Sequence, residues 1–136
     1  MRPSREETFM RVAEVVSARS TCERTAVGAI VVSSEGLQIL GIGYNGAPRG
    51  QPNQCVSKVP GVCGCIHAEL NAILKAPGTL QRTTLFTTVA PCLACARLIL
   101  NTGIVYVVYR STYRDSAGLQ LLTDAGIITK QLPPDL

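Results

Sequence analysis

Residues that bind metals and move protons cluster at two places in this sequence. In GCIHAELNAI, His67 is the only histidine of the 136-residue chain, and it stands two residues before Glu69. In APCLACA, Cys92 and Cys95 form a Cys-x-x-Cys pair. A zinc ion held by three protein ligands keeps its fourth position for water, which is typical of catalytic sites. We therefore predict that His67, Cys92 and Cys95 bind a catalytic zinc.

Glu69 is not needed to complete this ligand set, so its position close to His67 indicates a role other than metal binding. A carboxylate two residues from a zinc ligand is well placed to carry protons to and from zinc-bound water. The order H-x-E followed by P-C-x-x-C also matches the signature of zinc-dependent nucleobase deaminases. A packed core histidine and two buried thiols are the alternative interpretation. Finding both motifs in one chain, each just before a predicted helix, favours the metal site.

The secondary structure that must position these residues follows from the pattern of apolar residues and turn residues. Ser4 and Glu7 fit a capping box at the start of the first helix. The predicted helices cover residues 4–17, 66–75, 92–103 and 116–122. The predicted strands cover residues 26–33, 38–44, 83–89, 104–109 and 126–132. A long loop rich in Gly and Pro fills residues 45–65.

Regular alternation of strands and helices predicts a single layered α/β domain over residues 1–136 with a partly parallel sheet. His67 and Cys92 both fall where a helix begins. We expect two adjacent parallel βα units to bring these helix starts together. Helix N-termini favour negative charge, which biases Cys92 and Cys95 toward the metal-binding thiolate form.

Composition excludes several classes of function. The N-terminal segment MRPSREETFM is charged and unlike a signal peptide, and no apolar run is long enough to span a bilayer. We therefore expect a cytoplasmic protein without a membrane partner. The net charge of +4 suits a phosphate-bearing ligand but is too small to indicate a nucleic-acid partner. Six cysteines without a secretory signal indicate metal or redox chemistry rather than a disulfide framework.

Longer segments extend the signature to most of the chain. STCERTAVGAIVV, GIGYNGAPRG, IHAELNAI, TTVAPCLACARLI, GIVYVVY and AGI follow one another over residues 20–129. In this order they resemble the deoxycytidylate (dCMP) deaminases. The resemblance implies a cytidine-deaminase-like three-layer α/β fold, with a central five-stranded mixed sheet flanked by helices. It also implies zinc-dependent hydrolysis of dCMP to dUMP and ammonia, and a homo-oligomer, commonly a hexamer.

The resemblance further implies how the substrate is held and attacked. Hydroxide formed at zinc attacks C4 of cytosine, and Glu69 passes protons to N3 and to the departing amino group. Candidate substrate contacts are Asn45 (sugar), Arg24 (5′-phosphate), Ser20 and Thr21 (added hydroxyl donors), the main chain near Ala68 (base edge) and Tyr113 (mouth of the site). A turn asparagine, a solvated arginine and a surface tyrosine are the alternative interpretations of Asn45, Arg24 and Tyr113.

Four further cysteines remain, namely Cys22, Cys55, Cys63 and Cys65. Cys22 and Cys55 resemble positions that bind a second, structural zinc in some family members, and the CGC sequence can supply two more thiolates. Four thiolates make a closed structural zinc site that would pin the long loop. The alternatives are reduced thiols or a disulfide, although Cys63 and Cys65 are too close to pair with each other.

The sequence is compatible with nucleotide regulation and with more than one class of substrate. Family members are often activated by Mg²⁺–dCTP and inhibited by dTTP through the loop that here reads GYNGAPRG, in which Arg49 could contact phosphate. Another substrate, such as a nucleoside or adenosine in tRNA, is compatible with the zinc signature. The C-terminal stretch AGIITKQLPPDL is hardly basic, which argues against tRNA. A non-catalytic zinc-stapled binding module is the remaining alternative, but it leaves Glu69 unexplained.

Overall fold

A five-stranded mixed sheet lies at the centre of the molecule. The computed structural model describes residues 1–57, 59 and 62–134. Its strands are β1 (Gly28–Val32), β2 (Ile39–Tyr44), β3 (Thr83–Val89), β4 (Ile104–Ser111) and β5 (Ile128–Gln131). They are arranged in the order β2-β1-β3-β4-β5. Strand β1 pairs antiparallel with both neighbours, whereas β3, β4 and β5 are parallel, so the predicted mixed sheet is confirmed.

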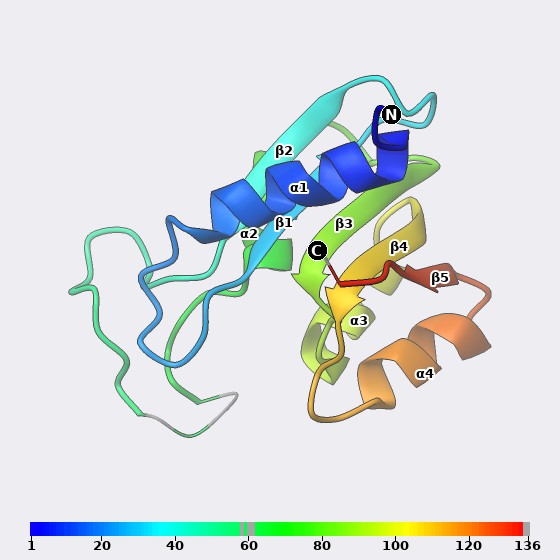
Figure 1. The fold of residues 1–136 in the computed structure, drawn as a ribbon. Helices are drawn as coiled ribbons and strands as arrows, with labels where there is room; N and C mark the ends of the chain where they lie inside the picture. The colour runs from blue at the N-terminus through cyan, green and yellow to red at the C-terminus, as the bar shows by residue number, and fades with distance from the viewer. Residues whose placement is uncertain (58, 60–61, 135–136) are drawn as a thin grey trace.

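Helices cover both faces of this sheet and make three layers. The helices are α1 (Arg5–Ser17), α2 (Ala68–Lys75), α3 (Leu93–Leu100) and α4 (Ala117–Asp124). Helix α1 crosses one face, and the other three helices lie on the opposite face (Figure 1). Among the residues described, no helix combines the length and apolar character needed to cross a bilayer.

The central strand β1 explains why both faces must be covered. Its five residues are all buried, and their side chains alternate between the two faces. Ile30 and Val32 join the hydrophobic cluster under α1, which includes Met10. Ala29 and Val31 join the larger cluster under α2, α3 and α4. A strand buried on both sides is fixed in register, because a slip by one residue would exchange the two sets of side chains.

Local contacts set where two of the helices begin. The Ser4 Oγ accepts a hydrogen bond from the Glu7 backbone N–H at 3.0 Å, as the capping box predicts. The Glu7 carboxylate, however, pairs with Arg110 instead of returning to the Ser4 backbone. Helix α2 begins at Ala68, two residues later than predicted. The cause is an isolated antiparallel bridge, in which the Ile66 N–H donates to the Gly46 carbonyl oxygen at 2.7 Å.

Helix α2 lies so close to β2 that the strand needs glycines there. A Cβ on Gly43 would come within 2.4 Å of the Ala68 carbonyl oxygen, and one on Gly41 within 2.3 Å of the Ala72 carbonyl oxygen. Real Cβ contacts are never this short, so only glycine lets the helix backbone approach the strand. This contact fixes the first turn of α2 relative to the sheet.

The two helix starts meet for a different reason from the one predicted. Helix α2 follows β2 and helix α3 follows β3, and both strands run antiparallel to β1. They therefore run in the same direction, but β1 lies between them and they are not adjacent. The expectation of adjacent parallel βα units was wrong in this respect. The starts of α2 and α3 nevertheless lie at the same edge of the sheet.

A buried arginine ties α1 to the sheet. Arg110 of β4 donates to the Glu7 carboxylate at 2.7 Å and to the Glu14 carboxylate at 2.9 Å. It also donates to the Pro133 carbonyl oxygen at 2.7 Å. Hydrogen bonds from Arg110 hold the pKa of Glu7 below its ordinary value. This cluster lies on the α1 face, away from the zinc-ligand candidates.

Candidate active site

The three predicted zinc ligands come together at the starts of α2 and α3. The His67 Nδ1 lies 3.2 Å from the Cys95 Sγ and 3.5 Å from the Cys92 Sγ. Tetrahedral zinc with ordinary bond lengths separates a nitrogen ligand from a sulfur ligand by about 3.5 Å. The donor set therefore fits zinc without rearrangement. His67 is the N-cap of α2 and Cys92 is the N-cap of α3, so helix geometry aims both side chains at one point.

Electrostatics at this point favour a bound cation. Hydrogen bonding from Cys95 and His67 lowers the pKa of Cys92 to about 3, against the opposing effect of burial. The neighbouring Cys92 thiolate in turn raises the pKa of Cys95, and it also raises the pKa of His67. The negatively charged Cys92 sulfur thus stabilises a proton on the Cys95 thiol and a proton on the His67 ring. A metal ion that replaced these protons would be held by both sulfurs and the imidazole.

Glu69 lies beside this set and is almost completely buried. Its side chain emerges from the first turn of α2, and the residue is only 4% exposed. Burial raises the pKa of Glu69 above the ordinary value for a glutamate. A buried carboxyl group that faces a metal site and holds its proton more tightly than usual is suited to proton transfer near neutral pH.

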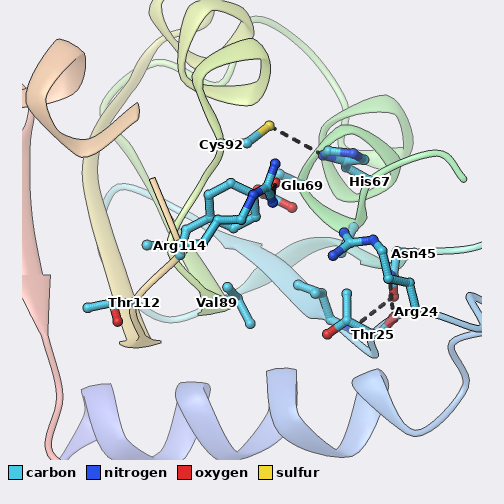
Figure 2. Close-up of a pocket in the computed structure, with 13 residues that line it drawn as sticks. Arg24, Thr25, Asn45, His67, Glu69, Val89, Cys92, Thr112 and Arg114 are labelled. Atoms are coloured by element: carbon cyan, nitrogen blue, oxygen red, sulfur yellow. Dashed lines mark hydrogen bonds between the residues drawn. The ribbon is translucent and has the colours of Figure 1, made fainter. Parts of the chain in front are cut away.

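A cavity of about 170 Å³ opens in front of Glu69. Its lining comes from the segment before β1, from the residues after β2, β3 and β4, and from the first turns of α2 and α3. Figure 2 shows Glu69, His67 and Cys92 gathered at one side of this cavity. Ligands of α/β proteins commonly bind at the carboxyl ends of parallel strands, and this cavity occupies that edge.

Four of the six predicted substrate contacts line the cavity, namely Arg24, Asn45, Ala68 and Tyr113. Ser20 and Thr21 are not among the lining residues, and their hydroxyl groups contact the loops around it. The Ser20 Oγ lies 2.6 Å from the Asn45 Oδ1. The Thr21 Oγ1 accepts a hydrogen bond from the Ala47 N–H at 3.3 Å. Both residues thus brace the wall of the cavity.

Asn45 uses most of its side-chain hydrogen bonds within the protein. Its Oδ1 accepts from the Val27 N–H at 2.8 Å, and its Nδ2 donates to the Thr25 carbonyl oxygen at 2.8 Å. Asn45 therefore joins the end of β2 to the segment before β1. One Nδ2 hydrogen remains for a ligand, because an amide nitrogen carries two.

Two arginines enter the cavity from opposite sides (Figure 2). Arg24 has a buried Nε that lacks a hydrogen-bond partner among the described residues. Arg114 was not predicted from the sequence; its guanidinium lies 4.6 Å from the centre of the Tyr113 ring. The sequence feature that could have indicated Arg114 is its place three residues after the end of β4, at the same sheet edge as Cys92. Two guanidinium groups in one cavity favour an anionic ligand such as a phosphate ester.

The other four cysteines form a second cluster. The Cys55 Sγ lies 3.7 Å from the Cys22 Sγ and 3.7 Å from the Cys65 Sγ. With Cys63, all four sulfurs lie within 4.8 Å of one another. Tetrahedral zinc with four thiolates separates its sulfurs by about 3.8 Å. The predicted set is thus brought together in a geometry that fits a four-thiolate metal site.

Charge in this second cluster is shared unequally. Burial raises the pKa of Cys22, but backbone N–H groups of Thr25 and Arg24 outweigh burial and bring it to about 7. Burial and hydrogen bonding to its neighbours raise the pKa of Cys65. Of these two sulfurs, Cys22 therefore becomes a thiolate more readily than Cys65.

With this geometry in place, comparison with known proteins decides the family. Residues 3–111 match the family described as cytidine and deoxycytidylate deaminase zinc-binding region. The chain belongs to this family. The matched segment contains both helix starts and all six cysteines, so the zinc-binding region of the family coincides with the site described above.

Individual relatives are similar along most of this deaminase-family chain. It is 38% identical over 144 residues to a deoxycytidylate deaminase of Saccharomyces cerevisiae, with 96% of this chain and 46% of the yeast protein covered. It thus spans about half the length of that relative. A deoxycytidylate deaminase of Mycobacterium phage D29 is 40% identical, with 79% of this chain and 95% of the phage protein covered.

A solved structure extends the similarity to the fold. The crystal structure of the dCMP deaminase from cyanophage S-TIM5, in complex with dCMP and dUMP, superimposes with a TM-score of 0.84 at 33% identity. The match covers 97% of this chain and 99% of the cyanophage chain. The three-layer, cytidine-deaminase-like fold predicted from the sequence is therefore confirmed.

Proposed function

We propose that this protein hydrolyses dCMP to dUMP and ammonia. The observation that carries the proposal is the buried Glu69 carboxyl group, which lines the same cavity as His67 and Cys92, two members of the three-residue set completed by Cys95. The arginines at both sides of the cavity support a substrate with a phosphate group. Further support comes from the cyanophage relative, whose structure contains dCMP and dUMP.

The chain's own residues supply the proton transfers. His67, Cys92 and Cys95 would hold a zinc ion, which would supply a water molecule activated near neutral pH. Glu69 accepts a proton as the water oxygen bonds to C4 of cytosine, and it delivers this proton to N3. Glu69 then takes the remaining proton from the oxygen now bonded to C4 and passes it to the amino group, so that the C4 carbonyl forms, the C4–N bond breaks and ammonia leaves. The raised pKa of the buried Glu69 suits this alternation between acid and base.

The remaining lining residues would hold the nucleotide. Arg24 and Arg114 bind the 5′-phosphate, because guanidinium groups bind phosphate oxygens through paired hydrogen bonds. Asn45 donates its free Nδ2 hydrogen to the sugar, and the main chain near Ala68 contacts the base. Tyr113 covers the mouth of the cavity. Ser20 and Thr21 contribute by bracing the wall around Asn45, the contacts in which they are found.

An absorbance assay on four substrates tests this function. We expect turnover of dCMP and much slower turnover of deoxycytidine, cytidine and dCTP, because Arg24 and Arg114 are proposed to bind a single phosphate group. Comparing dCMP with deoxycytidine isolates the contribution of the phosphate. Equal rates on dCMP and deoxycytidine would contradict phosphate recognition. No turnover of any of the four by zinc-loaded protein would contradict the deaminase function.

We also propose that Cys22, Cys55, Cys63 and Cys65 bind a second, structural zinc. The spacing of the four sulfurs supports this assignment. Metal analysis of purified protein should give two zinc ions per chain. One zinc per chain with four titratable thiols would contradict the second site.

Two further properties implied by the family can be tested in the same preparations. We propose that Mg²⁺–dCTP acts as an effector near the loop that contains Arg49, beside a cavity lined by residues such as Ala47 and Gln51. A shift of the dCMP saturation curve on adding Mg²⁺–dCTP, and its loss in Arg49→Gln, would support this assignment. An unchanged curve would contradict it.

We further propose a homo-oligomer, with a hexamer as the form that the family suggests. Support comes from apolar side chains on the outer strand β2 and on helix α2, where Ile39, Ile42 and Leu74 are exposed. Light scattering coupled to size-exclusion chromatography should give a multiple of the 14.5 kDa chain mass. A monomer mass at micromolar concentration would contradict the proposal.

A further inference from the structure

The four-cysteine cluster is joined directly to one wall of the cavity. Cys22 lies two residues before Arg24 and three before Thr25, both of which line the cavity. The backbone N–H groups of Arg24 and Thr25 interact with the Cys22 sulfur, so this segment folds around that sulfur. The Cys22 N–H also donates to the Ser20 Oγ at 3.2 Å. The position of Cys22 therefore sets the backbone from which the Arg24 side chain leaves.

A second connection reaches the same segment from the long loop. The Cys55 N–H donates to the Glu23 carboxylate at 2.5 Å, directly beside Arg24. The Cys55 sulfur lies 3.7 Å from the Cys22 sulfur in the same cluster. Residues 22–25 belong to no helix or strand and hold their place through such contacts. Loss of the cluster would release this segment on both sides of Arg24.

The catalytic residues are held in another way. His67 and Glu69 lie at the start of α2, which packs directly on Gly41 and Gly43 of the sheet. The bridge between Ile66 and Gly46 also fixes the entry to this helix. Although Cys65 is two residues from His67, these contacts do not depend on the cluster. Disturbing the cluster should therefore act on Arg24 more than on the chemical step.

We propose that the four-cysteine metal site positions Arg24 and thereby sets the affinity of the protein for the substrate's phosphate group. This inference rests on the proposed dCMP deamination. The buried Nε of Arg24, which has no partner among the described residues, is the second observation that points to a ligand at this place. In this assignment Arg24 touches the phosphate, and the cysteines are positioning residues.

The first experiment replaces one cysteine that lies outside the cavity lining. Cys55→Ser should reduce the metal content from two ions per chain to one. It should raise the KM for dCMP by about 5-fold to 150-fold, the usual range of coupling between sites. The kcat for dCMP and the kcat/KM for deoxycytidine should stay within about 2-fold, below that coupling range. Asn53→Ser, an exposed neighbour in the same loop and outside both cavities, is the control and should change neither metal content nor KM.

A double-mutant cycle then tests whether the effect passes through Arg24. Arg24→Ala should raise the KM for dCMP while keeping two metal ions. Adding Cys55→Ser to Arg24→Ala should raise the KM no further, because residues that act through one another are not additive. Additive effects would overturn the assignment. Loss of one metal ion in Cys55→Ser without a change in the KM for dCMP would also overturn it. Equal losses of kcat/KM on dCMP and on deoxycytidine would overturn it as well.

A second measurement uses the unmodified protein, so it does not depend on the folding of a variant. By reciprocity, a ligand that binds through Arg24 must stabilise the four-cysteine metal. With cobalt in place of zinc, dUMP should raise the chelator concentration at which half of the thiolate–cobalt absorption of the four-cysteine site is lost at equilibrium, and deoxyuridine should not. The proposal would be overturned if dUMP and deoxyuridine protect the cobalt ion equally. It would also be overturned if dUMP binds to the protein and gives the cobalt ion no protection.

These outcomes separate this inference from the proposed function. A protein that binds two metal ions but does not turn over dCMP contradicts the deaminase function, and the inference falls with it. A protein that turns over dCMP, but whose KM is insensitive to Cys55→Ser with one metal ion lost, contradicts the coupling alone.

Discussion

The backbone of Gly43 lies directly beneath Ala68, so that a Cβ on the glycine would come within 2.4 Å of the Ala68 carbonyl oxygen. Gly43→Ala must therefore push the first turn of α2 away from the sheet. We expect a loss of stability of about 1–3 kcal/mol from overpacking and a large loss of kcat, because Glu69 and His67 move with the helix. Thermal unfolding and dCMP turnover measure the two effects. Gly78→Ala, at φ +74° with no atom within 4 Å of the added Cβ, should lose stability through backbone strain alone and keep full kcat, so it separates the two effects. Full activity in Gly43→Ala would contradict the role of this contact.

Glu69→Gln tests the proton-transfer role. The amide has nearly the same shape, but it can neither accept the water proton nor return it. We expect kcat to fall by about 10²- to 10⁴-fold, the usual contribution of general acid–base catalysis, while zinc content stays unchanged. Glu35→Gln, an exposed glutamate in the turn between β1 and β2, should keep full activity. Retained turnover in Glu69→Gln, or loss of zinc as the cause of inactivity, would contradict the assignment.

Arg114→Gln tests the contact that the sequence did not predict. Losing a charge-assisted hydrogen bond to phosphate costs about 1.5–3 kcal/mol, which corresponds to roughly 10- to 150-fold in KM for dCMP. Turnover of deoxycytidine should not change. Arg97→Gln makes the same change in net charge on an exposed face of α3, outside the cavity lining. If both variants raise KM equally, the effect is one of overall charge and not of a contact at the site.

Glu7→Gln tests the pH dependence of the Arg110 cluster. The pKa of Glu7 is lowered in the folded protein, so its contribution to stability is present above its ordinary pKa of 4.5 and is lost as pH falls through the lower, folded value. We expect the variant to be less stable than the original protein by about 1.5–3 kcal/mol at pH 7, the scale of a hydrogen bond to a charged group. The difference should shrink at acid pH.

Unfolding curves measured at pH 7 and at progressively lower pH check this prediction. Glu35→Gln, whose exposed carboxylate also has a pKa lowered by backbone and side-chain hydrogen bonds within its own turn, serves as the reference for a lowered pKa without an ion pair. A stability difference for Glu7→Gln that stays constant or grows toward acid pH has the wrong sign and would exclude the ion pair as its cause.

The zinc-ligand candidates were predictable because metal-binding residue types stand only a few positions apart in the sequence. His67 and Glu69 lie two residues apart, and Cys92 and Cys95 three apart, so each half needs only one helix start to be placed correctly. Strand β3 was also predicted with its observed bounds, because Thr83–Val89 is a short β-prone run between turns.

Features that depend on chain segments meeting in space were harder to predict. Arg114 reads as an ordinary charged residue after a strand, and only the sheet order places it opposite Arg24. The hydroxyls of Ser20 and Thr21 look free in the sequence, but loop packing turns them toward Asn45 and Ala47. Helix α2 starts late because Ile66 pairs with Gly46, a partner 20 residues away. Residues 58, 60 and 61 of the predicted loop lie outside the described residues.

The insertion of β1 between β2 and β3 has a consequence for how the protein folds. His67 follows β2 and Cys92 follows β3, so the two halves of the candidate zinc site align only after both strands have paired with β1. Pairing between distant segments forms late, since it must first overcome the entropy of loop closure. Capture of the ion by all three ligands should therefore be among the last steps of folding. A nascent chain has to keep its thiols reduced until that moment, and its zinc supply matters most at the end of assembly.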